Sequence, residues 1–554
     1  MKTDIEIAQA AQLESIDVVA RRAKIKKEYL EYYGNNKAKV NLSIFNDVET
    51  QSNGKLILVT AITPTKAGEG KSTTTVGLVD GLAQINKSVI GALREPSLGP
   101  VFGIKGGATG GGFAQVVPME EINLHFTGDM HAVTTVNNLI SAIIDNHIYH
   151  GNELNIDPDK IIWKRCMDMN DRALREITIA QGDKNGVERK DGFNITVASE
   201  IMAVLCLSTS LVDFEQKVKK IVVAYDRNDK PITIENLKIS GSLAMIMKDA
   251  IKPNLVQTLE NNPVLIHGGP FANIAHGCNS IIATKLALKL ADYVVTEAGF
   301  GADLGAEKFI DIKCRLNNIK PSAVVIVATT RALKVHGGVL LADVKEENLQ
   351  ALTDGLANLA KHIETVQSFG VPFVVSLNEF ATDTNQEIRL IRQWCEDREY
   401  PFVINSGWAK GGKGVIDLAN AVVKLCEHDS EINYLYDLED SLEDKIKKIA
   451  QKAYGAKDVE FTKDTLKQLQ AFKDNGWQGL PICMAKTPNS LTDNAKIFGR
   501  PTDFVITVKE LRISAGAGFV VVLTGNIMTM PGLPKQPAAL SMGIDELGNT
   551  YGLY

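Results

Sequence analysis

Short apolar runs alternate with longer stretches of helical periodicity along most of the chain. Residues 55–61 form a β-branched run of strand length, a glycine-rich turn follows, and residues 73–85 carry apolar positions at helical spacing. Similar strand-length runs, each followed by Gly, Asn or Thr and then by a helical stretch, lie at 264–267, 293–296, 323–328, 373–377 and 402–405. Such alternation is typical of parallel strands connected by helices. The pattern therefore predicts an α/β fold with a parallel sheet covered by helices.

The two ends of the chain depart from this alternation. Residues 5–33 have apolar positions at helical spacing and end at Gly34-Asn35-Asn36, which predicts one or two leading helices. Residues 431–473 are rich in charge and poor in glycine, whereas 503–523 contain strand-like runs before a proline-rich segment. We therefore predict a main α/β domain with leading helices over 1–430, a partly helical smaller domain over 431–486 and a C-terminal α+β segment over 487–554.

Composition narrows the class of protein. The 45% hydrophobic and 23% charged content is that of an ordinary globular protein, and a net charge of -6 over 554 residues argues against bulk binding of nucleic acid. We find no signal peptide, membrane anchor or run of about 18 apolar residues. The seven cysteines occur singly, which favours a reduced cytoplasm. Cys278 and Cys483 could be nucleophiles, but a lone cysteine in an apolar stretch is more often buried packing.

A candidate phosphate-binding loop lies between the first predicted strand and its helix. Gly68 and Gly70 allow backbone N–H groups to approach a phosphate closely at the start of the helix. Lys71 adds mobile positive charge, and Ser72 can bind magnesium. Thr65 replaces the first glycine of the usual pattern, and the alternative interpretation is a glycine-rich turn with a solvated lysine. The predicted P-loop consists of Thr65, Lys66, Ala67, Gly68, Glu69, Gly70, Lys71 and Ser72.

Two charged residues at the ends of predicted strands are further candidates. Glu297 ends the run at 293–297 and could hold magnesium through water, or it could instead cap a helix or form a salt bridge. Arg94 follows the apolar run 88–93, and its guanidinium fork suits a carboxylate or an acyl phosphate. The alternative for Arg94 is a surface salt bridge with Glu95.

A second glycine-rich loop and a histidine cluster follow. Residues 103–113 are too dense in glycine for regular structure and include Lys105, which indicates another anion-binding loop. His125, Asp129 and His131 could bind a metal or carry protons, although structural hydrogen bonding is the simpler interpretation because their spacing defines no common face.

Three aromatic residues lie in loops directly after predicted strands. They are Phe300, Phe380 and Trp408. Loop aromatics at the carboxyl ends of strands can stack on a flat heterocycle. Any one of them taken alone is more often explained by packing of its loop.

Two segments resemble signatures of the formate–tetrahydrofolate ligase family. Residues 103–113 match the pattern G-[LIVM]-K-G-G-A-A-G-G-G-Y except at Thr109 and Phe113, and residues 327–338 match the second signature except at Thr330. Lys66 occupies a position where the family often has proline. The order of these motifs and the length of the chain resemble the monofunctional bacterial enzyme from end to end.

The resemblance implies a P-loop NTPase-like fold and an ATP-dependent ligase. Formate would be activated as formyl phosphate and transferred to tetrahydrofolate, giving 10-formyltetrahydrofolate, ADP and phosphate. Lys71 and the P-loop would hold ATP with Mg²⁺, Arg94 would hold formate and formyl phosphate, and Phe380 and Trp408, with Phe300 nearby, would line the folate pocket. A cytoplasmic homotetramer activated by a monovalent cation (K⁺ or NH₄⁺) and using polyglutamylated folate is also implied. For Arg331 and Lys334 of the second signature we predict only loop structure or anion contact.

Two other functions fit parts of the sequence. A different carboxylate- or carbamate-phosphorylating ligase, similar to dethiobiotin synthetase, would share the P-loop and little else. A nucleotide switch that partitions DNA or membrane proteins has a similar lysine-bearing loop at 66–72, but it also needs a basic patch or a terminal amphipathic helix. Neither a basic patch nor a terminal amphipathic helix is evident in the sequence.

Overall fold

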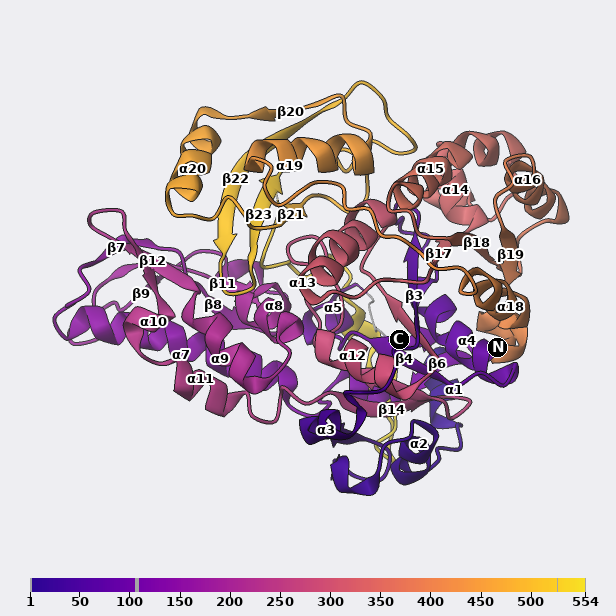
Figure 1. Cartoon of the computed structure of the whole chain (residues 1–554), viewed down its shortest axis with the longest axis horizontal. Coiled ribbons are helices and arrows are strands. Elements are labelled where there is room, and N and C mark those ends of the chain that lie inside the picture. Colours follow the sequence, from indigo (N-terminus) through magenta and orange to yellow (C-terminus); the bar gives the residue numbers. More distant parts are fainter. Residues whose placement is uncertain (1, 105–108, 526, 554) are drawn as a thin grey trace.

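The main sheet combines antiparallel strands at one edge with a long parallel series. In the computed structural model, which describes residues 2–104, 109–525 and 527–553, its strands follow the order β1-β2-β14-β15-β4-β16-β3-β17-β18-β19 (Figure 1). All neighbours from β15 to β19 in this order are parallel. The bounds are β1 (Leu30–Tyr32), β2 (Ala38–Val40), β14 (Asn254–Thr258), β15 (Pro263–Ile266), β4 (Val89–Leu93), β16 (Tyr293–Glu297), β3 (Lys55–Ala61), β17 (Ala323–Ala328), β18 (Phe373–Asn378) and β19 (Phe402–Asn405). The predicted α/β class with a mostly parallel sheet is confirmed.

Alternate side chains of the central strands enter different apolar clusters. Leu56 and Leu58 of β3 pack in the cluster that includes α15 (Leu349–Ser368), whereas Ile57 and Val59 pack with α4 (Lys71–Gln84) and α18 (Ile416–Leu425). Because strand side chains alternate between faces, helices cover both faces of this sheet. Burial on both faces explains why the sequence shows continuous β-branched runs here rather than alternation. Other helices that follow parallel strands are α12 (Ile281–Leu290), α14 (Thr330–His336), α16 (Asn385–Glu396) and α17 (Gly407–Lys410).

The start of the chain corrects one prediction. Two leading helices are present, α1 (Asp4–Gln9) and α2 (Ile16–Arg22), but helix does not continue to Tyr33. Instead β1 pairs with β2 as an antiparallel hairpin that turns at Gly34, whose φ is +86°. Leu30 is buried and Tyr32 is exposed, and β2 extends the hairpin onto β14 of the main sheet. Tertiary pairing therefore overrides local helical spacing in this segment.

Residues 129–251 form a lobe beside the main sheet. This lobe lies at the left of Figure 1. A separate apolar cluster holds it together, with Val133 and Ile140 of its first helix packed near Ile201 and Phe214. Its elements are α7 (Asp129–Tyr149), β7 (Ile156–Ile161), β8 (Arg165–Met167), β9 (Ile177–Ile179), β10 (Arg189–Asp191), β11 (Phe193–Ile195), α8 (Glu200–Leu207), α9 (Leu211–Lys219), β12 (Val222–Asp226), β13 (Pro231–Thr233), α10 (Ile234–Leu237) and α11 (Ser240–Ile246).

A four-stranded sheet near the end of the chain takes strands from both predicted C-terminal segments. Its order is β20-β22-β23-β21 (Figure 1). Strands β20 (Asp458–Phe461) and β21 (Ile482–Ala485) precede residue 487, whereas β22 (Val505–Ser514) and β23 (Phe519–Thr524) follow it. Helices α19 (Leu442–Ile449) and α20 (Lys463–Asp474) accompany this sheet. The segments 431–486 and 487–554 thus share one sheet. Within the described part of the chain, no helix has both the length and the apolar character needed to cross a membrane.

Candidate active site

Most of the predicted site residues follow the carboxyl ends of adjacent parallel strands. Strands β4, β16 and β3 are neighbours, and β18 and β19 pair further along the same sheet. Arg94 follows β4, Glu297 ends β16, and Phe380 and Trp408 follow β18 and β19. Ligands of α/β proteins bind at this edge because the connecting loops and helix N-termini meet there. The edge is therefore the candidate active site.

The loop after β3 is closed by one of its own carboxyl groups. Glu69 accepts hydrogen bonds from Thr65 N at 2.7 Å and from Thr65 Oγ1 at 3.1 Å, and Ala67 N donates to Thr65 Oγ1 at 3.1 Å. Burial raises the pKa of Glu69 to about 7. Lys66, in contrast, is exposed at the tip of the loop.

Glycine at position 70 is required by both backbone and space. Its φ is +69°, and a Cβ there would lie 2.1 Å from Nδ2 of Asn378 at the end of β18. Gly68 also has a left-handed φ, of +79°. The loop therefore turns into α4 with its backbone packed closely against a neighbouring strand end, where only glycine fits.

Lys71 connects this loop to the turn after β16. Its ammonium group donates to the carbonyl oxygen of Ala298 and, at 3.2 Å, to that of Phe300. Burial lowers the pKa of Lys71 to about 8, and nearby Glu297 opposes this effect. The amine of half-buried Lys71 thus joins the loop after β3 to the turn after β16.

Ser72, Glu297 and Arg94 form a connected set beside Lys71. Ser72 Oγ donates to Glu297 Oε2 at 3.0 Å, and Arg94 Nη2 lies 3.9 Å from Glu297 Oε1. Arg94 Nη1 also donates to the carbonyl oxygen of Pro270 at 3.2 Å. Its Nε is buried without a hydrogen-bond partner among the described residues. The ion pair of Arg94 is therefore with Glu297, not with Glu95 as the alternative interpretation had it, and the guanidinium retains donor capacity for a ligand.

The same set offers oxygen ligands of the kind that Mg²⁺ prefers. A hydroxyl and a carboxylate oxygen lie side by side, and Glu297 is only 2% exposed. No group of three or more His, Cys, Asp or Glu side chains that could hold a metal occurs in the ranges described. Mg²⁺ at nucleotide sites commonly takes one or two protein ligands and fills the rest with phosphate and water. Ser72 and Glu297 fit that pattern.

Phe300 occupies a constrained turn after β16. Its φ is +61°, which is uncommon for a bulky residue. A Cβ on Gly299 would lie 2.4 Å from the Ala272 side chain, and one on Gly301 would lie 2.8 Å from Asp303 Oδ1. Close packing on both sides thus holds Phe300 in the left-handed region, and backbone strain of this kind concentrates at functional sites.

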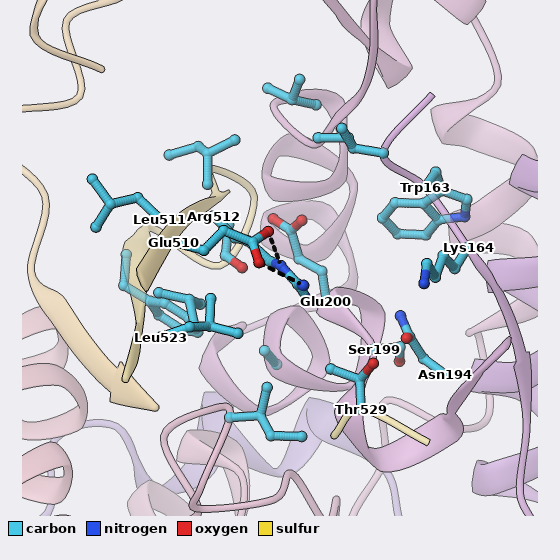
Figure 2. Close-up of a pocket in the computed structure, with 18 of the residues that line it drawn as sticks. Trp163, Lys164, Asn194, Ser199, Glu200, Glu510, Leu511, Arg512, Leu523 and Thr529 are labelled. Atoms are coloured by element: carbon cyan, nitrogen blue, oxygen red, sulfur yellow. Dashed lines mark hydrogen bonds and ion pairs between the residues drawn. The ribbon is translucent and has the colours of Figure 1, made fainter. Parts of the chain in front are cut away.

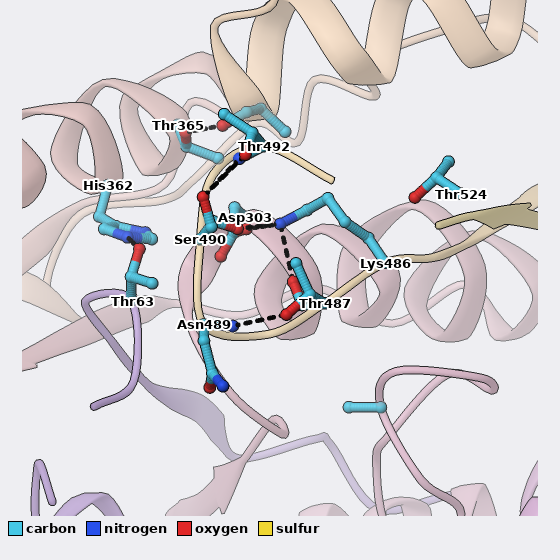
Figure 3. A network of polar contacts seen from close by, with 12 residues as sticks. Thr63, Asp303, His362, Thr365, Lys486, Thr487, Asn489, Ser490, Thr492 and Thr524 are labelled. Atoms are coloured by element: carbon cyan, nitrogen blue, oxygen red, sulfur yellow. Dashed lines mark hydrogen bonds and ion pairs between the residues drawn. The ribbon is translucent and has the colours of Figure 1, made fainter. Parts of the chain in front are cut away.

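A buried ion pair joins this turn to the C-terminal region. Lys486 Nζ lies 3.2 Å from Asp303 Oδ2, and neither side chain is exposed to solvent. Figure 3 shows Lys486 reaching Asp303 from the segment that follows β21. The turn after β16 is therefore fixed from the C-terminal side as well.

Thr63, two residues after β3, is held by side chains from distant parts of the chain. Its hydroxyl contacts His362 Nε2 at 2.9 Å and accepts from Asn358 Nδ2 at 3.0 Å (Figure 3). His336 Nε2 donates to the Thr63 carbonyl oxygen at 2.8 Å. Burial lowers the pKa of His362 to about 4 and lowers that of His336, so both rings are neutral. Sequence reasoning missed this cluster, and its only signal was that His336 lies in the second signature.

The other two aromatics lie at the ends of β18 and β19. The Phe380 ring packs under a guanidinium from α14. Trp408 is 37% exposed, and its carbonyl oxygen accepts from Phe113 N at 2.8 Å. A Cβ on Gly112 would lie 2.8 Å from the Trp408 ring. Trp408 therefore packs on the end of the second glycine-rich loop, whose Lys105-Gly106-Gly107-Ala108 portion lies outside the described residues.

Several other candidates lie apart from this edge or are committed to structural contacts. Asp129 is ion-paired with buried Lys39 at 2.7 Å and accepts from Asn254 Nδ2 at 2.8 Å, while His125 and His131 are exposed. The structural interpretation therefore fits Asp129.

Cys278 and Cys483 are both buried, and burial raises the pKa of each thiol, that of Cys483 to about 11. Neither thiol is poised as a nucleophile.

A cavity of about 750 Å³ lies away from these residues, between α8 and the C-terminal sheet. Figure 2 shows Trp163, Glu200 and Leu523 on its walls. Burial raises the pKa of Glu200 to about 8, and its carboxyl group accepts from Gly516 N at 2.8 Å. None of the predicted P-loop, metal, Arg94 or aromatic residues is among those that line it.

Comparison with known protein families identifies the family to which the chain belongs. A model of the family described as formate–tetrahydrofolate ligase matches residues 2–554. The match covers the loop after β3, both glycine-rich signatures and the C-terminal sheet in one continuous span. The chain therefore belongs to the formate–tetrahydrofolate ligase family, carbon–nitrogen ligases that join formate to tetrahydrofolate at the expense of ATP.

Proposed function

We propose that the chain converts formate, tetrahydrofolate and ATP into 10-formyltetrahydrofolate, ADP and phosphate through formyl phosphate. Residues 65–72 act as a P-loop for ATP. The observation that carries the proposal is the meeting of Lys71, the Ser72–Glu297 pair and Arg94 at three adjacent strand ends. A phosphate-binding lysine, oxygen ligands for Mg²⁺ and a carboxylate-binding arginine are the groups that carboxylate phosphorylation needs.

The first step makes formate reactive. Formate cannot expel oxide, so a formate oxygen attacks the γ-phosphorus of ATP, the bond from that phosphorus to the β-bridging oxygen breaks, and ADP leaves. Lys71 and the loop amides stabilise charge on the transferring phosphoryl group, and Arg94 orients the attacking carboxylate. Ser72 and Glu297 would hold Mg²⁺, which neutralises phosphate charge when bound.

The second step transfers the formyl group. The N10 amine of tetrahydrofolate attacks the formyl carbon, phosphate leaves, and N10 then loses its proton. An arylamine becomes acidic only after attack, so departing phosphate can accept that proton. We assign no protein base, because Asp129 is already paired with Lys39 at 2.7 Å.

The remaining features of the proposal concern assembly and setting. We propose a cytoplasmic homotetramer activated by K⁺ or NH₄⁺, with polyglutamylated folate as its substrate. The tetramer, the cation and the polyglutamylated substrate rest on the family resemblance and not on contacts within this chain. The domain divisions after residues 430 and 486 stay predictions from charge and glycine content, and the sheet β20-β22-β23-β21 crosses the second of them.

Dependence of ATP turnover on both other substrates tests the proposed reaction. Phosphate release from ATP should require formate and tetrahydrofolate together, and 10-formyltetrahydrofolate should accumulate in equal amount. Release stimulated by a different carboxylate would favour another carboxylate-phosphorylating ligase. Release that requires neither substrate would favour a nucleotide switch.

Replacing Phe380 or Trp408 with alanine is expected to weaken folate use selectively. Stacking of a planar ring on one aromatic side chain contributes about 1 kcal/mol, so the KM for tetrahydrofolate should rise about fivefold. The KM for ATP should change less. Steady-state kinetics with each substrate varied in turn gives both values. A rise confined to the KM for ATP would place adenine, rather than folate, on these rings.

A further inference from the structure

Helix α14 stands between two loops of the candidate active site. It follows β17, which lies between β3 and β18 in the sheet. At its C-terminal end, His336 binds the carbonyl oxygen of Thr63 in the loop after β3. At its N-terminal end, Thr330 and Arg331 contact the loop after β18, which carries Phe380. The second signature thus links the proposed ATP and folate sites through one short helix.

The Arg331 guanidinium is stacked on the Phe380 ring. Its central carbon lies over the ring, 3.8 Å from the centroid, which is well within the range of a cation–π contact. Arg331 Nη2 also donates to Thr382 Oγ1 at 2.9 Å, so the guanidinium is anchored to the same loop. One face of the Phe380 ring is therefore occupied by a planar cation.

The backbone of Phe380 is fixed by the residue before Arg331. Thr330 Oγ1 donates to one carboxylate oxygen of Asp383, and the other oxygen accepts from Phe380 N at 2.9 Å. Residues of α14 thus reach both the backbone of Phe380, through Asp383, and its ring. Thr330 is one of the departures from the family pattern, and its hydroxyl has this identifiable role.

Lys334, the other cation of the signature, makes only buried contacts within the protein. Its Nζ lies 2.6 Å from Glu387 Oε1 and donates to the Glu346 carbonyl oxygen at 2.7 Å. Lys334 and Glu387 are 1% and 0% exposed. Lys334 therefore ties α14 to α16 and has no access to a substrate anion.

We infer that Arg331 is a positioning residue for tetrahydrofolate. It acts through Phe380: the guanidinium supports one face of the ring, and the opposite face stacks on the flat heterocycle of the folate. The inference rests on the proposed function, in which Phe380 belongs to the folate pocket. Planarity of the guanidinium, not charge alone, provides the support.

A double-mutant cycle separates action through Phe380 from direct contact with the substrate. The variants are Arg331→Met, Phe380→Ala and the double variant, each tested for the KM of tetrahydrofolate, the KM of ATP and thermal stability. Arg331→Met is expected to raise the folate KM about three- to fivefold, as loss of a cation–π contact implies. In the Phe380→Ala background it should add no further increase. The KM for ATP should stay within about twofold throughout.

A conservative variant and a matched control accompany the cycle. Arg331→Lys retains the charge and is expected to behave like Arg331→Met, and it serves in its place if the methionine variant fails to fold. Arg398→Met removes a similar contact, in which an exposed guanidinium just after α16 lies 4.4 Å from the half-buried Trp394 ring, and it should leave the folate KM unchanged.

Each other outcome overturns the inference in a distinguishable way. An equal KM increase from Arg331→Met in both backgrounds would mean that Arg331 contacts the folate itself. No increase in either background, alongside a clear effect of Phe380→Ala, would show that Arg331 is only structural. If Phe380→Ala alone leaves the folate KM unchanged, the proposed folate pocket is wrong and the inference is lost with it.

Discussion

A Lys71→Ala variant is expected to lose ligase activity by at least about 10²- to 10³-fold while remaining folded. In the proposed function the ammonium group stabilises the transferring phosphoryl group, and loss of one positioned donor from an active site costs about 3–4 kcal/mol of transition-state stabilisation. Lys71 is half-buried, and burial lowers its pKa to about 8. Phosphate release dependent on formate and folate gives the rate, and thermal unfolding gives the stability.

Lys66 provides a matched control for this variant. It belongs to the same loop and carries the same charge, but it is exposed at the tip. Lys66→Ala should therefore retain most of the activity, because an exposed cation acts on phosphate through water. Normal turnover by a folded Lys71→Ala protein would exclude residues 65–72 as the ATP site.

An Arg94→Lys variant is expected to lose turnover strongly, by about 10²-fold, with ATP affinity within a few-fold of normal. Arg94 follows β4 rather than the strand before the loop, and its fork can donate two parallel bonds to a carboxylate or an acyl phosphate. Lysine keeps the charge but loses paired donation and reach. Steady-state kinetics with varied formate measures the first effect, and calorimetric titration with ATP measures the second.

The reverse half-reaction locates the defect. ADP and carbamoyl phosphate, a stable mimic of formyl phosphate, yield ATP when the phosphoryl group passes to ADP and carbamate leaves. Arg94→Lys should impair this synthesis as much as the forward reaction. Preserved ATP synthesis with weakened ADP affinity would instead assign Arg94 to the nucleotide, and Lys105 would become the first alternative for the acyl phosphate.

Local features of the sequence were enough to predict the central strands. The predicted runs at 55–61, 323–328 and 402–405 have the same bounds as β3, β17 and β19. For β3 and β17 this succeeded because strands buried on both faces must be continuously apolar and β-branched, so their signal is strong within a few residues. Strand β19, at the edge of the sheet, is half-buried and was predicted from its short apolar run alone. The hairpin at Leu30–Val40 was missed for the opposite reason: its pairing, and not its spacing, makes it a strand.

The glycine-rich loop after β3 was also recognisable, because the residues that define the motif are adjacent in the sequence. Gly68, Gly70, Lys71 and Ser72 follow one strand and start one helix. Contacts with distant residues were visible only in the structure. The Asn378 side chain packs directly against Gly70, and His336 and His362 contact Thr63.

By itself, the sequence determined the fold class, the family and the types of residue available for chemistry. Only the tertiary structure decided which of them meet. Ser72 and Glu297 are 225 positions apart and touch because β16 inserts between β3 and β4, and the same insertion pairs Arg94 with Glu297 instead of its neighbour Glu95. Likewise, Arg331 stacks on Phe380 because β17 and β18 are adjacent. Periodicity and short motifs report contacts within a few residues, whereas strand order is set by the packing of the whole chain, and the contacts between strand ends follow from that order.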